Sequence, residues 1–112
     1  MPALKVISVG SDPELLWLRN AALKSAGFDV ESAEHHDHAL AAIQRGHCGT
    51  LLICYSLKEP IRQALADAFR KHCPEGRIVE ITNERMEKSD FADTFVYGVE
   101  GPEALIEAIR RD

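Results

Sequence analysis

The chain has 112 residues, of which 46% are hydrophobic, and this size and composition are expected of one globular domain around a single core. Its formal net charge of −5 argues against a nucleic-acid partner, because binding to a phosphate backbone relies on clustered lysines and arginines. No apolar run approaches the roughly 20 residues that span a bilayer, and the start of the chain lacks a signal-peptide pattern. We therefore expect one domain over residues 1–112, in the cytoplasm, with no membrane or nucleic-acid partner.

The three cysteines are Cys48, Cys54 and Cys73, and no two of them have Cys-x-x-Cys spacing. An odd number of cysteines in a chain without a signal peptide is typical of reduced thiols. The sequence therefore predicts neither a disulfide framework nor a zinc site built on cysteine.

Segments with strand character alternate with segments of helical character along the chain. Strands are expected at residues 4–9, 28–33, 50–57, 78–82 and 94–97. Helices are expected at residues 13–26, 37–45, 60–73, 83–89 and 102–110. The helix at 83–89 is very polar and has almost no apolar stripe, so we expect it to be loosely held.

The first helix carries clear start and stop signals. Asp12 before Pro13 fits an N-cap followed by proline at the first helical position, while Ser11 and Glu14 would alternatively form a capping box. Gly27 fits the residue that ends the helix. The expected inward stripe is Leu15, Leu18, Ala22 and Ala26 with Leu23 beside it, and the expected exposed residues are Arg19, Asn20 and Lys24.

Five alternating strands and helices favour an α/β fold in which a parallel sheet has helices on both faces. In this length they suit a doubly wound, flavodoxin-like (βα)5 arrangement with strand order 2-1-3-4-5. That order brings the carboxyl ends of the first and third strands together. Gly10, Ser11, Asp12 and Cys54 are therefore expected to line one shallow cleft.

Several local phrases resemble the receiver domain of bacterial two-component response regulators, and the resemblance extends over essentially the whole chain. Residues 9–13 (Val-Gly-Ser-Asp-Pro) are similar to the phrase Val-Asp-Asp-Asp-Pro that ends the first strand in that family. Residues 26–30 (Ala-Gly-Phe-Asp-Val) and 101–105 (Gly-Pro-Glu-Ala-Leu) are similar to its phrases after the first helix and before the last. Residues 52–57 (Leu-Ile-Cys-Tyr-Ser-Leu) are similar to its phosphorylation strand, in which an aspartate precedes Tyr-Ser-Leu.

The resemblance implies that the chemical positions of a receiver are emptied in this chain. The phosphoryl-accepting aspartate falls on Cys54, the acidic metal-binding pair on Gly10 and Ser11, and the lysine that contacts the phosphoryl group on Gly98. Because Mg²⁺ needs carboxylate oxygens and phosphoryl transfer needs the metal and the lysine, neither is expected here. The chain is thus interpreted as a degenerate receiver, or pseudo-receiver, that is not an enzyme and has no cofactor or metal.

The switch positions of the family are retained, with Thr82 at the hydroxyl position and Phe95 at the aromatic position. In receivers the fourth helix, fifth strand and fifth helix form the face that meets partners. The resemblance therefore implies phosphorylation-independent binding of a protein, namely a sensor kinase, a regulator or a second copy, through Met86, Phe95 and Tyr97. Trp17, which lies off the inward stripe, is a second possible anchor, or it packs against the neighbouring helix.

Two alternatives to a protein-binding module start from the cleft. Cys54 could be a reactive thiol in a redox sensor, which needs a nearby cation, a protonated histidine or a helix N-terminus, and Lys58 is the nearest cation in sequence. The competing interpretation of Cys54 is a small apolar residue at the end of a buried strand. The other alternative is a small neutral ligand bound at Ser11, Cys54, Ser56 and Thr82.

Two further groups of residues are weighed against simpler explanations. His35, His36, Asp37 and His38 offer metal ligands, but neighbouring histidines rarely converge on one ion and no partner follows at finger spacing. Glu80 should lie on the same strand face as Thr82. It would be a general base only with a nucleophile beside it, so a satisfied hydrogen bond is the favoured interpretation.

Overall fold

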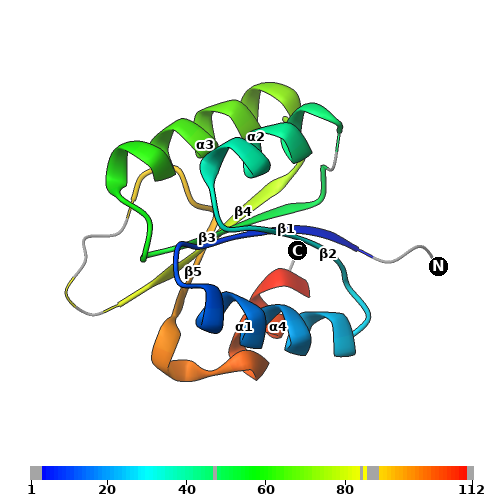
Figure 1. The fold of residues 1–112 in the computed structure, drawn as a ribbon, viewed down its shortest axis with the longest axis vertical. Helices are drawn as coiled ribbons and strands as arrows, with labels where there is room; N and C mark the ends of the chain where they lie inside the picture. The colour runs from blue at the N-terminus through cyan, green and yellow to red at the C-terminus, as the bar shows by residue number, and fades with distance from the viewer. Residues whose placement is uncertain (1–3, 47, 84, 86–88, 111–112) are drawn as a thin grey trace.

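A computed structural model describes residues 4–46, 48–83, 85 and 89–110, in which a parallel sheet lies between two layers of helices (Figure 1). Helices α2 and α3 cover one face of the sheet, and α1 and α4 cover the other. The elements are β1 (Lys5–Val9), α1 (Pro13–Ser25), β2 (Asp29–Ala33), α2 (His36–Gln44), β3 (Thr50–Cys54), α3 (Glu59–His72), β4 (Arg77–Thr82), β5 (Thr94–Tyr97), the 3₁₀-helix η1 (Gly98–Glu100) and α4 (Pro102–Arg110).

The five strands pair in parallel in the order β2-β1-β3-β4-β5, so the predicted sheet topology is confirmed. Val9 at the end of β1 pairs with Ile53 near the end of β3, which places the carboxyl ends of these strands side by side. β2 lies at one edge of the sheet, with Asp29 and Ser32 exposed.

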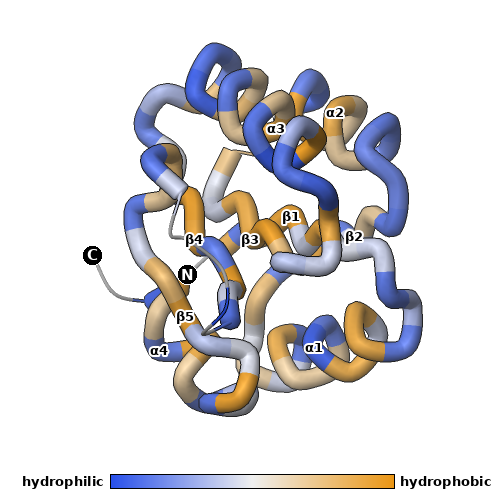
Figure 2. Tube along the Cα trace, turned by 90° about the vertical axis from the view of Figure 1, so that its left-hand side faces the viewer, coloured by the Kyte–Doolittle hydropathy of each residue, from blue (hydrophilic) through white to orange (hydrophobic). Residues whose placement is uncertain are grey.

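The core is divided into two halves by the sheet, because successive side chains of a strand point to opposite faces. Leu51 and Ile53 of β3 pack in the cluster under α2 and α3, whereas Leu52 packs in the cluster over α1 and α4. All five residues of β3 are buried, as expected for a central strand covered on both faces. Figure 2 shows the resulting pattern, with hydrophobic strands inside and hydrophilic segments on the helices outside.

Helix α1 begins as predicted but is rotated from the predicted orientation. The Oδ1 of Asp12 accepts a hydrogen bond from the backbone N–H of Leu15 at 3.2 Å, which confirms the N-cap. Leu18, predicted to face inward, is 54% exposed, whereas Asn20, predicted to face outward, is 6% exposed. The four consecutive apolar residues 15–18 allow more than one apolar stripe, and packing selects the one through Leu16, Asn20 and Leu23.

One of the five predicted helices, at residues 83–89, is not found in the part of the chain that the structure describes. Asn83, Arg85 and Ser89 are described and are not helical, so the described fold has four α-helices rather than the five of a (βα)5 chain. The segment lacks an apolar face, and a short helix without one gains little from packing. Just after it, the Nη2 of Arg70 donates hydrogen bonds to the Phe91 carbonyl at 3.0 Å and to the Asp93 carboxylate at 2.9 Å.

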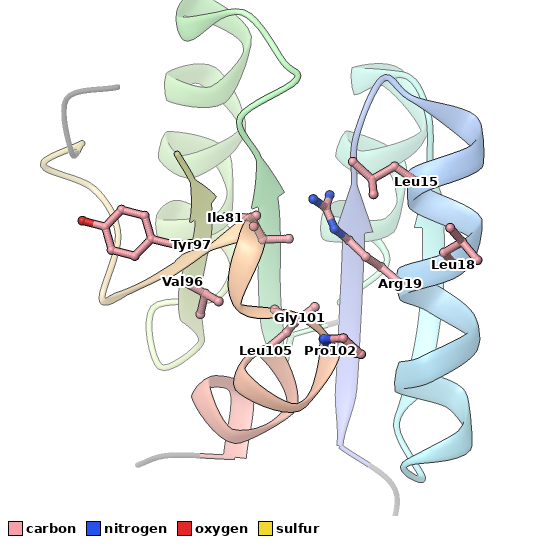
Figure 3. A pocket seen from close by; sticks show the side chains of 10 residues that line it. Leu15, Leu18, Arg19, Ile81, Val96, Tyr97, Gly101, Pro102 and Leu105 are labelled. Carbon is pink, nitrogen blue, oxygen red and sulfur yellow. The ribbon is translucent and has the colours of Figure 1, made fainter. Parts of the chain in front are cut away.

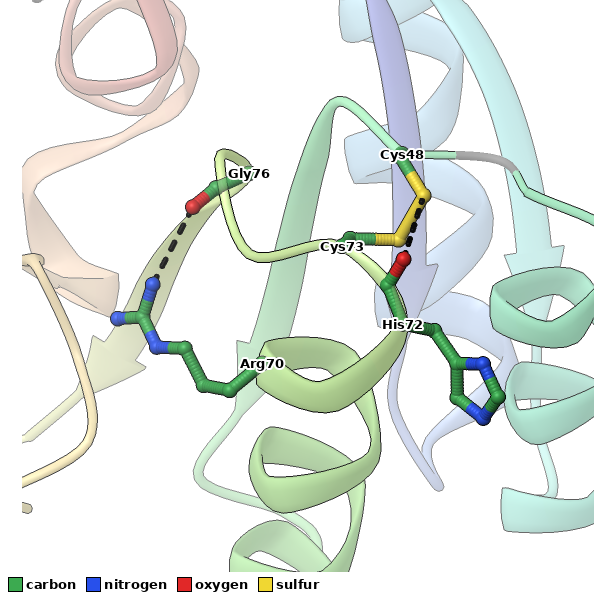
Figure 4. Close-up of a disulfide and its surroundings, with 5 residues drawn as sticks. All are labelled: Cys48, Arg70, His72, Cys73 and Gly76. Atoms are coloured by element: carbon green, nitrogen blue, oxygen red, sulfur yellow. Dashed lines mark hydrogen bonds between the residues drawn. A yellow bond between two sulfur atoms is a disulfide. The ribbon is translucent and has the colours of Figure 1, made fainter.

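Cys48 and Cys73 form a disulfide, so the prediction of three reduced thiols is wrong for this pair (Figure 4). Their Cα atoms lie 5.3 Å apart although 25 positions separate them in sequence. Cys48 precedes β3 and Cys73 follows α3, and the parallel pairing of β3 with β4 brings these two ends together. Cys54 is a free, buried cysteine.

Candidate functional site

The carboxyl ends of β1 and β3 lie side by side, and two hydrogen bonds join Ser11 to Ser56 there. The backbone N–H of Ser11 donates to the Ser56 Oγ at 3.1 Å, and the Ser11 Oγ donates to the Ser56 carbonyl at 3.0 Å. Gly10 is buried, and a Cβ placed on it would lie 3.4 Å from the Cβ of Cys54. The structure therefore brings Gly10, Ser11 and Cys54 together with Ser56.

An arginine from α1 contacts the thiol at the end of β3. The Nη1 of Arg19 lies 2.8 Å from the Sγ of Cys54, which is only 2% exposed. This contact is not expected from the sequence, in which Arg19 is predicted on the exposed side of its helix and Lys58 is the cation nearest to Cys54. The missed signal was the helix position itself, since Arg19 lies one turn after Leu15 on a helix that starts beside the end of β3.

Glu80 and Arg62 form a buried ion pair on the other side of the sheet. The Arg62 Nη1 donates to the Glu80 Oε2 at 3.1 Å, and the side chains are 9% and 0% exposed. The Glu80 Oε1 also accepts hydrogen bonds from the Oγ and the backbone N–H of Ser89 at 3.1 and 3.4 Å. Glu80 is thus a satisfied structural carboxylate, as the favoured interpretation had it.

A cavity of about 230 Å³ lies between α1 and the chain from β4 to α4 (Figure 3). A second, shallower hollow of about 520 Å³ adjoins it and shares Leu15, Arg19, Tyr97 and Gly98 with it. Neither hollow could be predicted from the sequence, because their walls come mainly from α1 and from the distant segment between β4 and α4. The residues lining the first cavity are Leu15, Leu18, Arg19, Ile81, Val96, Tyr97, Gly98, Gly101, Pro102 and Leu105.

No protein-family model matches the chain, and a comparison with curated proteins gives no significant match. Solved structures do match. Chemotaxis protein CheY4 of Vibrio cholerae is 20% identical with a TM-score of 0.82, over 97% of this chain and 98% of that one. A CheY-like response regulator receiver domain protein from Methanospirillum hungatei is 20% identical with a TM-score of 0.82, over 96% and 91% of the two chains. Response regulator TrrA of Thermotoga maritima, in complex with Mg²⁺ and BeF, is 20% identical with a TM-score of 0.81, over 94% and 95%.

The chain has the receiver fold. At this level of identity the likeness shows the fold alone. Gly98 follows β5 directly, and a Cβ placed on it would lie 3.9 Å from the Arg19 Nη2. Gly98 thus presents no side chain here, while a guanidinium from α1 lies beside it.

The predicted switch and interaction residues Thr82, Phe95 and Tyr97 lie on β4 and β5. Thr82 ends β4 and is buried, and its Oγ1 donates to the Asn83 carbonyl at 3.4 Å. Phe95 and Tyr97 lie half-buried on β5, and the Tyr97 ring points away from the cavity in Figure 3. Met86, the third residue of the expected interaction face, lies outside the described residues.

The residues present do not fit a metal ion at the receiver site. Mg²⁺ prefers carboxylate oxygens, and Gly10, Ser11 and Cys54 supply none. Over residues 4–46, 48–83, 85 and 89–110, no three His, Cys, Asp or Glu side chains gather as metal ligands do. The rings of His35 and His38 lie 6.1 Å apart, and His36 Nε2 instead contacts the Asp37 carboxylate at 3.1 Å.

No described helix is both long and apolar enough to cross a membrane.

Proposed function

We propose that this domain is a signal-transduction module that binds another protein without accepting a phosphoryl group, and that it is not an enzyme. The observation that supports this most is the contact of Arg19 with Cys54. A receiver places an acceptor carboxylate here, whereas this chain places a buried thiol against a guanidinium. Without carboxylates, Mg²⁺ has no ligands, and without the metal the charge that develops on a transferring phosphoryl group is not neutralised.

Phosphoryl transfer is tested directly by incubating the protein with acetyl phosphate and Mg²⁺ and measuring its intact mass. A receiver with its aspartate, treated in parallel, is the positive control. We expect no gain of phosphoryl mass on this chain. Stoichiometric modification would refute the proposal.

The proposed partner is a sensor kinase, a regulator or a second copy, bound at the β5 and α4 side through Phe95 and Tyr97. Support comes from the receiver fold and from the outward direction of the Tyr97 ring. The test is a cross-linked pull-down from native lysate with the wild type and Tyr97→Ala. Trp17→Ala is the matched control, because Trp17 is 68% exposed on α1, away from β5. Loss of the partner with Tyr97→Ala supports the proposed face, whereas loss with Trp17→Ala alone transfers the interaction to α1.

A second candidate function is a thiol sensor at Cys54, and the Arg19 contact is the observation in its favour. Reactive cysteines lie beside cationic groups, and the Arg19 guanidinium contacts the Cys54 thiol. Against it, the 2% exposure of Cys54 limits access by oxidants. Alkylation of the native protein, followed by peptide mass mapping, tests this candidate function. Rapid labelling of Cys54 would support a thiol sensor, and labelling only after denaturation would refute it.

The cytoplasm is the proposed location, and the Cys48–Cys73 disulfide is the observation against it, because cytosolic reductants keep most thiols reduced. Acid quenching of cells followed by maleimide labelling tests this. Labelled Cys48 and Cys73 would agree with the cytoplasm, and an intact disulfide in the cell would contradict it.

A further inference from the structure

The cavity between α1 and α4 has apolar walls on nearly every side. Leu15 and Leu18 come from α1, and Ile81, Val96 and Leu105 come from β4, β5 and α4. A dry cavity of about 150 Å³ is known to hold benzene. By that comparison, a volume of about 230 Å³ accommodates an apolar body of roughly nine non-hydrogen atoms.

One end of this cavity is cationic. The guanidinium of Arg19 extends from α1 toward the sheet in Figure 3, and Arg85 lines the adjoining hollow. Of the described residues, none that lines either hollow is an aspartate or a glutamate. The chain carries 18 acidic residues against 13 basic ones, so an acid-free lining with two arginines is a local reversal of its charge.

Arg19 is poorly paired for a half-buried cation. The ion pairs among the described residues do not include it, and its one described hydrogen bond is to the Cys54 Sγ. Thiol sulfur is a weak acceptor, whereas a carboxylate accepts two hydrogen bonds from the guanidinium fork. Gly98 lines both hollows together with Arg19, and a Cβ on Gly98 would lie 3.9 Å from the Arg19 Nη2.

We infer that this cavity binds an amphipathic carboxylate. The apolar body, an alkyl chain or a single ring, fills the space between Leu15, Leu18 and Leu105. The carboxylate meets Arg19 where the two hollows join. Burial of the body supplies affinity, and the charged end supplies orientation and selects against neutral and cationic analogues. This site shares Tyr97 with the proposed protein-binding face, and its test depends neither on phosphorylation nor on a protein partner.

Octanoate is a suitable probe, because it has ten non-hydrogen atoms and one carboxylate, and octanol and octylammonium are its neutral and cationic counterparts. Each is titrated into ¹⁵N-labelled wild-type protein, and binding is followed by amide shifts. A ligand of this size is expected to bind with a Kd on the order of 1 mM or below. Shifts should cluster at residues 15–19 and 96–105. Octanoate should bind at least tenfold more tightly than octanol, and octylammonium should not bind.

Two variants test the role of Arg19. Arg19→Met keeps most of the apolar stem and removes the charge, so octanoate binding should fall at least tenfold while octanol binding stays within twofold. Lys24→Met is the matched control, because it removes one positive charge from the exposed side of the same helix and should leave octanoate binding unchanged.

Leu18→Glu provides an independent test that does not depend on whether Arg19→Met folds. Leu18 is mostly exposed at the rim, so a glutamate there should leave the fold intact and repel a carboxylate. Octanoate binding should weaken in this variant and octylammonium binding should become detectable. The inference is overturned if octanoate shifts lie elsewhere, if octanol binds as tightly as octanoate, or if Leu18→Glu binds octanoate like the wild type.

Discussion

Glu80 and Arg62 form an ion pair that is almost wholly withdrawn from solvent, and its two partners depend on each other. Arg62→Met would leave the Glu80 carboxylate buried with only the donors of Ser89. We expect the free energy of unfolding to fall by about 3–5 kcal/mol, because an uncompensated charge would remain in the core. Replacing both residues by methionine should restore most of the loss, and urea denaturation measures each variant.

The exposed pair of Arg45 with Glu31 is the matched control for this measurement, since the Arg45 side chain is mostly in solvent. Arg45→Met should cost about 1 kcal/mol or less, as exposed pairs usually do. If Arg62→Met and Arg45→Met lowered the free energy of unfolding equally, burial would not be the reason that the Arg62–Glu80 pair matters for stability.

Gly49 and Gly10 differ in what a side chain would meet, and this difference is testable. A Cβ on Gly49 would lie 2.2 Å from the backbone oxygen of Lys5, so β1 or β3 must shift. A Cβ on Gly10 would lie at an ordinary 3.4 Å from the Cys54 Cβ. Gly49→Ala should therefore destabilise the fold by about 1–3 kcal/mol, as overpacking does, and Gly10→Ala by much less. Thermal unfolding of the two variants compares them, and equal losses would contradict the packing argument.

The disulfide links two elements at their ends, and its contribution can be measured without any mutation. It closes a loop of 25 residues between the start of β3 and the end of α3. Loop-closure entropy predicts a loss of about 3 kcal/mol when such a bond is reduced. Urea midpoints of the oxidised and reduced protein measure this, with Cys48→Ser as a variant that should behave like the reduced form under both conditions. A midpoint insensitive to reduction would show that the bond does not constrain the unfolded chain.

At the scale of elements, the sequence predicts those features that depend on neighbouring residues. The Asp12 cap and the buried β3 strand follow from local composition, and the strand order follows from the alternation of strands with helices. The rotation of α1 does not, because residues 15–18 are all apolar and only packing against the sheet and α4 selects the inward face. The Arg19 contact with Cys54 was missed for this reason.

The Cys48–Cys73 disulfide could not be predicted from the sequence for a different physical reason. Its partners are set by where two strands begin in the sheet, and spacing along the chain carries no information on that distance. The polar segment at 83–89 was assigned helical character from a short stretch with no apolar face, where local preference is too weak to decide. Emptied positions at Gly10, Ser11 and Gly98, by contrast, could be proposed from the sequence, because a missing carboxylate or lysine is visible in the residue type.

For the molecule as a whole, Cys54 and the Cys48–Cys73 disulfide lie at opposite ends of the strands of the sheet. Cys54 ends β3, whereas Cys48 precedes β3 and Cys73 precedes β4. Because the strands are parallel, they all begin on one side of the molecule and all end on the opposite side, as can be followed in Figure 1. The disulfide therefore joins the chain where β3 and β4 begin, at the other end of β3 from Cys54. Reduction of the disulfide should leave the surroundings of Cys54 unchanged.

If the scaffold is a receiver that has lost only its chemical groups, returning those groups should return the chemistry in steps. Cys54→Asp alone should stay inactive, because one carboxylate facing Arg19 is paired by the guanidinium and still lacks a metal-binding pair. Adding Gly10→Asp and Ser11→Asp supplies that pair, and a Cβ on Gly10 fits without displacing its neighbours. We expect this triple variant to bind Mg²⁺ and to gain phosphoryl mass from acetyl phosphate, with further gain when Gly98→Lys supplies the cation.

The control variant combines Gly10→Asp and Ser11→Asp with Cys54→Asn in place of Cys54→Asp. It should bind the metal weakly and remain unmodified. A folded triple variant that does not bind Mg²⁺ would show that Gly10, Ser11 and Cys54 do not occupy the positions of a receiver site.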